Sequence, residues 1–360
     1  MRTTETGMLR QSRMSLLRIR GAAVFLMLIS GCQAPVSSLS SASTPINTLP
    51  KRAMDVLTTA LQHRDNPAVR VEAIEALETA GGEQARPWIR SALLDDTPAV
   101  RFAACMAIGR NKDHAALGAV DKALADGNAS VRVAALFARH KLGRTNRTGE
   151  VTTYLLDHPD VTVRRNAALV LGLLSEQGGI RVLARAMRDR DSGVRQHALE
   201  AMARLGNREA KQELTFMANT GVGSEEVFAL NALIETGDRS FVETFRYKFI
   251  NADHLETKLS AARGLGMCGS TEGYELALRS FESQKPVRED RDDPAADQVL
   301  RVRQLAAAAL GAIGRKDALP ILERELGAST DPRLQVSIAR AMLQIMSSDT
   351  QRRTASPPPS

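Results

Sequence analysis

The sequence predicts an all-α protein, an α-solenoid (superhelix) of about nine two-helix repeats. Three periodic features predict this fold. The pair Val-Arg recurs at 69–70, 100–101, 131–132, 163–164, 194–195 and 302–303. An alanine follows four residues after each valine, and a large apolar residue follows after eight in five of the six copies. Such spacing marks one apolar stripe of a helix, and the glycine that ends four copies is typical of a left-handed helix stop.

Three weaker copies complete the series. They begin at Glu225, Thr257 and Leu334, and each keeps apolar residues four and eight positions later. The nine repeats then follow one another at 31 or 32 residues, except between the seventh and eighth, where the interval is 45. The extra residues place an insertion loop at 282–298, which we expect to be solvated or to project as a contact loop.

Each repeat also contains a second apolar-periodic stretch ahead of the Val-Arg helix, for example at 115–124 and 180–187. Turn residues such as Asp, Asn and Pro join the two stretches, for example in Asp65-Asn66-Pro67. Asp or Asn can cap the second helix, and Pro suits its first turn. Two short antiparallel helices per unit cannot bury their apolar stripes alone, so neighbouring units must stack into one continuous core.

This pattern resembles the HEAT-repeat family, in the short form of the phycobilisome lyases. The motif D-x-x-x-V-R-x-x-A-x-x-A-L-G is nearly complete from Asp96 to Gly109, with Ile108 in place of the leucine. The resemblance covers about residues 51–346. It implies a curved solenoid that binds other proteins.

The N-terminal residues 1–31 predict a lipoprotein signal peptide. Basic residues precede an uncharged apolar run at 22–29, which is shorter than the roughly 20 residues of a spanning helix. The sequence Ile29-Ser30-Gly31-Cys32 resembles a bacterial lipobox, and this resemblance implies cleavage before Cys32 and lipidation of its thiol. An ordinary signal peptide with a chance cysteine is the alternative. A start at Met14 gives a more typical leader length than one at Met1 or Met8.

Residues 32–50 are rich in Ser, Thr and Pro, which predicts a flexible tether behind the lipidated Cys32. Gln33 follows the cysteine, and by resemblance to the enterobacterial sorting rule this favours the outer membrane, facing the periplasm. We also expect a disordered tail at 347–360. The sequence thus predicts a protein of the cell envelope that is attached to a membrane through its N-terminal lipid.

Composition excludes several function classes. Aromatic residues make up only 4% of the chain, too few for a platform on which bases stack. The formal net charge of +7 falls to +3 without residues 1–31, which hold five arginines and one glutamate. We therefore expect no nucleic-acid partner.

We expect the basic column at the second position of the repeats to be a structural ladder. Its members are Arg70, Arg101, Arg132, Arg164, Arg195, Lys258 and Arg303. In the family that the chain resembles, turn aspartates pair with these side chains, and the candidates are Asp65, Asp96, Asp160, Asp191 and Asp253. A cationic strip for phosphate or carboxylate is the alternative. The sixth repeat has Glu225 and Glu226 instead, which indicates a weak repeat or a local acidic patch.

Candidate catalytic and metal-binding residues are few. HEAT-like deoxyhypusine hydroxylases hold iron with His-Glu pairs, and none of the six histidines here is followed by Glu. Cys105 and Cys268 have the character of small buried residues rather than nucleophiles. The acidic insertion lacks the glycine and terminal glutamate of a calcium hand. We therefore expect no enzyme, cofactor or metal.

The concave face should carry the recognition surface, at the third and sixth positions after each repeat start. Phe137 and Phe228 are the candidate anchors for a partner, because large side chains in central pockets dominate interface energetics. The sequence thus favours a non-enzymatic protein-interaction scaffold with a protein partner. A structural component that binds the cell wall or a polysaccharide remains an alternative, as does a HEAT-like enzyme related to bilin lyases or hydroxylases.

Overall fold

The structure, a computed structural model, describes residues 48–288 and 292–355, with side chains up to residue 347. Within these residues all regular structure is helical. The signal peptide, Cys32 with its lipobox, and most of the linker lie outside the described residues.

Eighteen α-helices in this part of the chain form nine antiparallel pairs, one for each repeat of the sequence. The first helices of the pairs are α1 (Leu49–Ala60), α3 (Gly82–Ser91), α5 (Leu117–Ala123), α7 (Gly149–Asp157), α9 (Gly179–Ala186), α11 (Arg208–Thr220), α13 (Val242–Asn251), α15 (Tyr274–Glu282) and α17 (Leu319–Ala328). The second helices are α2 (Pro67–Ala80), α4 (Pro98–Arg110), α6 (Ala129–Lys141), α8 (Val161–Leu174), α10 (Ser192–Arg204), α12 (Ser224–Glu235), α14 (Leu255–Met267), α16 (Ala295–Ile313) and α18 (Pro332–Ala355).

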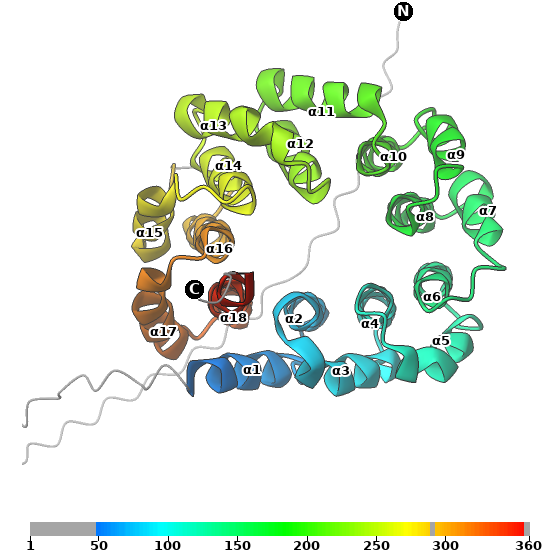
Figure 1. The fold of residues 1–360 in the computed structure, drawn as a ribbon, viewed down its shortest axis with the longest axis horizontal. Coiled ribbons are helices and arrows are strands. Elements are labelled where there is room, and N and C mark those ends of the chain that lie inside the picture. The colour runs from blue at the N-terminus through cyan, green and yellow to red at the C-terminus, as the bar shows by residue number, and fades with distance from the viewer. Residues whose placement is uncertain (1–47, 289–291, 356–360) are drawn as a thin grey trace, which may run out of the picture. The chain divides into compact units, whose positions relative to one another are not determined.

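The nine pairs close into a ring, with the first helices outside and the second helices inside (Figure 1). Each inner helix packs against the inner helix of the next pair, and the last, α18, packs against both α1 and α2. An ion pair between Arg52 of α1 and Glu323 of α17, with 3.1 Å between Nη1 and Oε1, joins the same ends. A solenoid of this kind is stabilised by contacts between neighbouring repeats, and here the first and last repeats are also neighbours.

The helix termini form largely for the reasons that the sequence indicates. The side chain of Asn66 accepts a hydrogen bond from the amide of Val69 and caps α2, whose first residue is Pro67. Left-handed glycines follow three of the predicted helix ends, at Gly143, Gly206 and Gly314. The fourth predicted stop also ends its helix, α2, but Gly81 has a φ of −83° and the next residue, Gly82, takes the left-handed conformation with a φ of 58°.

Two of the six Val-Arg repeats have no glycine at this position. Lys112 and Ser175 occupy it, and they are the two non-glycine residues of positive φ in the described chain, at 47° and 63°. The left-handed conformation therefore belongs to the repeat geometry and is kept even where a side chain makes it unfavourable.

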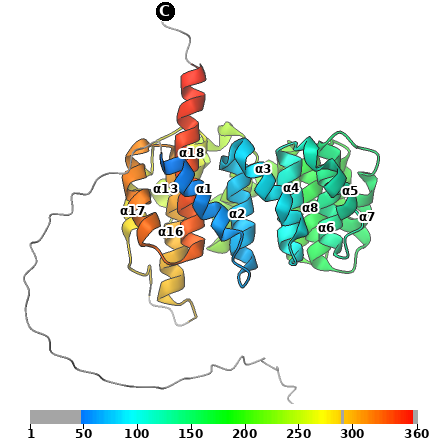
Figure 2. The same cartoon turned by 90° about the horizontal axis from the view of Figure 1, so that it is seen from below.

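The apolar stripes of both helix layers meet between the layers. This core consists mainly of Ala, Leu, Val and Ile, as the low aromatic content requires. The predicted disordered tail at 347–360 is wrong in its first part, because α18 runs to Ala355. Figure 2 shows this last segment of α18 extending beyond the other helices. Residues 356–360 lie outside the described part.

The insertion after α15 is tied to the ring by one buried amide. The Gln298 side chain accepts hydrogen bonds from the amides of Val287 and Arg288, and it donates to the carbonyls of Arg288 and Asp293. The insertion also lengthens α16 at its N-terminus, so part of the expected loop is helical.

Candidate functional site: the centre of the ring

Five of the seven residues in the predicted basic column make hydrogen bonds to the next repeat and form a ladder. Arg70 shows the pattern. Its Nη1 donates to the carbonyls of His63 and Arg64 in the turn of its own repeat, at 2.7 and 2.8 Å. Its Nε and Nη2 each donate to Asp95 in the next turn, both at 2.9 Å. Such forked pairing fixes geometry as well as adding energy, and it ties one repeat to the next.

The other members follow this pattern to different extents. Arg101 pairs in the same forked way with Asp126, and Arg164 with Asp189. Arg132 donates to the hydroxyl of Tyr154, Arg303 to the carboxylate of Glu325, and Arg195 and Lys258 to carbonyl oxygens. The arginines in forked pairs are therefore not available as the cationic strip for phosphate or carboxylate that the sequence left as an alternative.

The acidic partners differ from those that the sequence suggests. The forked rungs use Asp95, Asp126 and Asp189, whereas Asp96 makes one contact of 3.3 Å to Arg70. Asp160 serves as a helix cap instead, whereas Asp191 both caps α10 and pairs in the forked way with Arg165, the residue after Arg164. Asp95 and Asp189 lie one and two residues before the predicted Asp96 and Asp191. The local geometry of the turn thus decides which carboxylate reaches the guanidinium.

The sixth repeat contains a rung of reversed charge. Glu226 takes the position of the arginine, and its buried carboxylate pairs with Lys248 of α13 and accepts a hydrogen bond of 3.0 Å from Thr257 Oγ1. The departure from Val-Arg is therefore a substitute rung. Glu226 is buried, so the acidic surface patch considered above is wrong for this residue.

A central cavity of about 700 Å³ lies inside the ring. Side chains from eight of the nine inner helices line it, since α6 contributes none. Its charged lining residues are Glu75, Glu78, Arg110, Arg204, Glu235, Arg263 and Arg340. The sequence suggested the third and sixth positions after each repeat start for this surface, and the structure adds the tenth, which includes Arg110, Arg204 and Glu235.

Three of the four arginines in this lining have acidic partners. Arg110 pairs with Glu78 at 3.0 Å, and Arg263 pairs with Glu235 at 3.1 Å. Arg204 pairs with Glu200 at 2.9 Å. These pairs run between or along neighbouring inner helices and neutralise most of the cavity wall.

Burial in the cavity wall shifts two of these groups. It raises the pKa of Glu78 above its ordinary value, although the partner Arg110 opposes the shift. It also lowers the pKa of Arg340, against the attraction of Glu75. Both shifts penalise the charged form, as expected where water is partly excluded.

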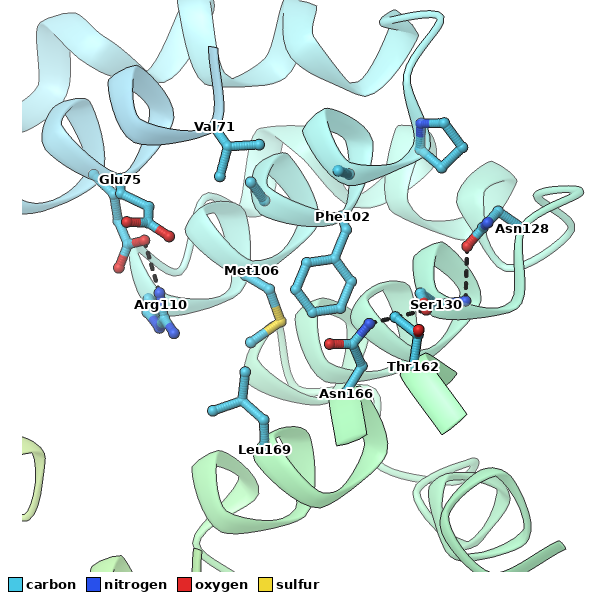
Figure 3. A pocket seen from close by; sticks show the side chains of 14 residues that line it. Val71, Glu75, Phe102, Met106, Arg110, Asn128, Ser130, Thr162, Asn166 and Leu169 are labelled. Carbon is cyan, nitrogen blue, oxygen red and sulfur yellow. Dashed lines mark hydrogen bonds and ion pairs between the residues drawn. The ribbon is translucent and has the colours of Figure 1, made fainter. Parts of the chain in front are cut away.

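An apolar hollow of about 450 Å³ adjoins the central cavity along α2, α4, α6 and α8. Figure 3 shows Phe102 and Met106 of α4 pointing into it, between Val71 above and Leu169 below. Glu75, Glu78 and Arg110 line both the hollow and the cavity. Polar side chains stand at its other end, where Asn166 Nδ2 donates to Ser130 Oγ at 2.9 Å. The centre of the ring thus offers apolar and charged surfaces side by side.

The two predicted anchors are not the residues that line this surface. Phe137 is fully buried, so its prediction as an accessible anchor is wrong. Its ring lies where a Cβ on Gly109 would stand, 2.7 Å from the nearest ring carbon, so Gly109 makes room for it. Phe228 is half-buried and packs against the apolar core. Phe102 and Met106 are the apolar residues of α4 that line the hollow, and they lie two and six positions after their repeat start.

The remaining candidates have no shared site. Cys105 and Cys268 are free thiols, and burial raises the pKa of Cys105 to about 12. Among the described residues, no group of three or more His, Cys, Asp or Glu side chains could hold a metal ion. Likewise, none of the helices described is both long and apolar enough to cross a membrane.

A family model of HEAT repeats matches residues 54–138 and 150–227, which include the forked rungs of Arg70, Arg101 and Arg164. These two stretches are HEAT repeats. The remaining pairs continue the same two-helix pattern around the ring. No curated protein sequence matches the chain.

Several solved structures are similar to this chain at low sequence identity. Human deoxyhypusine hydroxylase is 16% identical over 84% of this chain and 98% of its own, with a TM-score of 0.36. The CpcE–CpcF complex of phycocyanin lyase from Nostoc sp. PCC7120 is 18% identical over 72% and 94%, with a TM-score of 0.33. The YibA protein of Escherichia coli is 17% identical over 88% and 99%, with a TM-score of 0.32.

Proposed function

We propose that this protein is a non-enzymatic protein-interaction scaffold, held in the bacterial cell envelope by a lipid on Cys32. The observation that carries the proposal is the centre of the ring. Eight inner helices from widely separated repeats present one continuous surface there, with charged groups next to an apolar hollow. Such a preformed surface binds a partner without the cost of ordering itself first.

The envelope location rests on the sequence alone. The lipobox around Cys32 and the Ser/Thr/Pro-rich linker would hold the ring near a membrane and raise the local concentration of its partner there. Gln33 favours the outer membrane, facing the periplasm.

A crosslinking pull-down from envelope fractions tests the scaffold, with the full-length protein as bait. We expect a protein partner that the wild type captures and that a Phe102→Ala variant of the central surface loses. The matched control is Tyr247→Ser, because Tyr247 is an exposed aromatic residue on the outer helix α13. An empty pull-down with co-sedimentation on cell-wall sacculi would replace the scaffold by the wall-binding alternative.

The anchor has its own test. Replacing Cys32 with alanine should prevent lipidation and cleavage before this residue, so the variant should keep its leader and carry no lipid. A variant that is processed and retained like the wild type would contradict the lipoprotein assignment.

A further inference from the structure

Two opposite charges in the central cavity have no partner. Arg340 of α18 and Glu75 of α2 both line the cavity. Within the described residues, neither side chain makes a hydrogen bond or an ion pair, whereas Arg110, Arg204 and Arg263 all do. Arg340 and Glu75 are close enough to attract each other electrostatically, yet they do not form a pair. The cavity therefore holds one guanidinium and one carboxylate that a ligand can engage.

Leaving Arg340 unpaired is costly, because a guanidinium that is partly removed from water keeps its desolvation penalty unless an anion compensates it. The ladder shows that this chain supplies acidic partners where arginines are structural, as with Arg164 and Asp189. At Arg340 it supplies none within pairing distance. An anionic group from a ligand would fill this position.

The surroundings of Arg340 restrict the chemistry of that ligand. Glu78 and Glu235 are paired with arginines, but Glu75 lines the same cavity without a cationic partner, so a polyanion such as a nucleic acid or a polyphosphate would meet repulsion from Glu75 and leave it unmatched. A ligand that brings a cation to Glu75 together with an anion to Arg340 meets no such repulsion. Glu75 also borders the apolar hollow of Phe102 and Met106, so the cationic group should stand beside an apolar one.

We propose that the centre of the ring binds a peptide segment of its protein partner that presents an acidic group to Arg340, a basic group to Glu75 and an apolar side chain to the hollow. Peptides combine these three groups at short spacing. This inference rests on the scaffold function proposed above, and it names the chemistry of the partner. It also makes Arg340 and Glu75 specificity-determining residues with opposite preferences.

A peptide-selection experiment tests the proposal directly. The full-length protein, purified in detergent, is equilibrated with a pool of random hexapeptides that are acetylated and amidated, and the retained peptides are sequenced by mass spectrometry. Blocked ends ensure that side chains alone supply the charges. We expect enrichment of peptides that contain an acidic, a basic and an apolar residue together.

Three variants separate the three contacts. Arg340→Met should reduce the enrichment of acidic residues about tenfold and leave the basic preference, since one charged hydrogen-bonding partner is lost. Glu75→Gln should do the reverse, and Phe102→Ala should weaken the apolar preference alone. Arg185→Met, a change of an exposed arginine on the outer helix α9, is the matched control and should select like the wild type.

Other results would overturn the inference. Retained peptides of the same composition from wild type and Arg340→Met would do so, as would no enrichment by a wild-type protein of intact helical content. An envelope partner captured equally by wild type and Arg340→Met would leave the scaffold standing and remove only the central site. Displacement of the retained peptides by purified muropeptides alone would assign the site to the cell wall instead.

Discussion

The arginines of the ladder and the arginine at the centre of the ring are chemically identical and differ in their surroundings. Arg164 is buried, and it makes hydrogen bonds to two carbonyls of its own turn and to both oxygens of Asp189. Arg340 is half-buried and has no such partner among the described residues. The first side chain holds repeats together, and the second is available to a ligand. An arginine in this repeat sequence is therefore evidence of binding only where the fold supplies it with neither a carboxylate nor a carbonyl partner.

The largest expected effect comes from the reversed rung. Lys248→Met leaves the buried carboxylate of Glu226 without its cation, so the free energy of unfolding should fall by about 3–5 kcal/mol. Urea denaturation followed by circular dichroism measures this change. The control is Lys211→Met, which breaks the more exposed pair with Asp238 and should cost less than about 1 kcal/mol.

The double variant Glu226→Leu with Lys248→Met sharpens the interpretation. It removes both buried charges, so it should recover most of the stability that Lys248→Met loses. Equal instability of the single and double variants would show that the two side chains are needed for packing and not for their charges.

The comparison of the two arginines predicts effects of different size. Arg164→Met removes a forked pair and leaves two carbonyls without their donor, which should cost about 2 kcal/mol of unfolding free energy. Arg340→Met removes an unpaired and partly desolvated cation, so stability should stay the same or increase. Urea denaturation of both variants decides the matter, and a loss at Arg340 as large as at Arg164 would mean that Arg340 is structural.

Acid should weaken the ladder. The hydrogen bonds from Arg101 and Arg164 lower the pKa values of Asp126 and Asp189, and Arg165 lowers the pKa of Asp191 to about 2. Because the folded values lie below the unfolded ones, these carboxylates stabilise the fold above about pH 4. That contribution is lost as the pH falls toward 2.

An acid titration followed by circular dichroism tests this dependence. Between about pH 4 and pH 2, the free energy of unfolding should fall less in Arg164→Met than in the wild type, because the pKa of Asp189 is no longer lowered by Arg164 in this variant. Glu78 has a raised pKa, and its contribution has the opposite sign, being lost as the pH rises through its folded value. Identical acid profiles for both proteins would exclude the ladder as the acid-sensitive element.

The repeat helices and the ladder could be predicted from the sequence because both arise from contacts that recur every 31 or 32 residues. The choice of Asp95 over Asp96 could not, because it depends on how one turn folds. Phe137 was misjudged for a related reason. Its burial depends on Gly109 in the preceding repeat, and that glycine belongs to the very motif that identifies the fold.

No periodic feature of the sequence predicts that the ring closes. The contacts of α18 with α1 and α2 join residues about 270 positions apart, and nothing in a local pattern requires them. Closure also brings Arg340 of α18 and Glu75 of α2 to the same cavity. The placement of Arg340 and Glu75 in one cavity therefore depends on the contact between the last and the first repeat. The repeat pattern does not predict this contact, so the sequence placed the anchors elsewhere.

The smallest expected effect concerns the ion pair at this closure. Arg52 is substantially exposed in its pair with Glu323, so Arg52→Met should lower the free energy of unfolding by no more than about 0.5 kcal/mol. The apolar residues of α1 and α18 belong to the same core cluster, and their burial should hold the ring closed without the pair. Urea denaturation gives the energy, and peptide selection by the same variant shows whether the cavity survives. A large loss in either measurement would mean that the ion pair of Arg52 and Glu323 closes the ring, as the ion pairs of the ladder hold neighbouring repeats together elsewhere in the molecule.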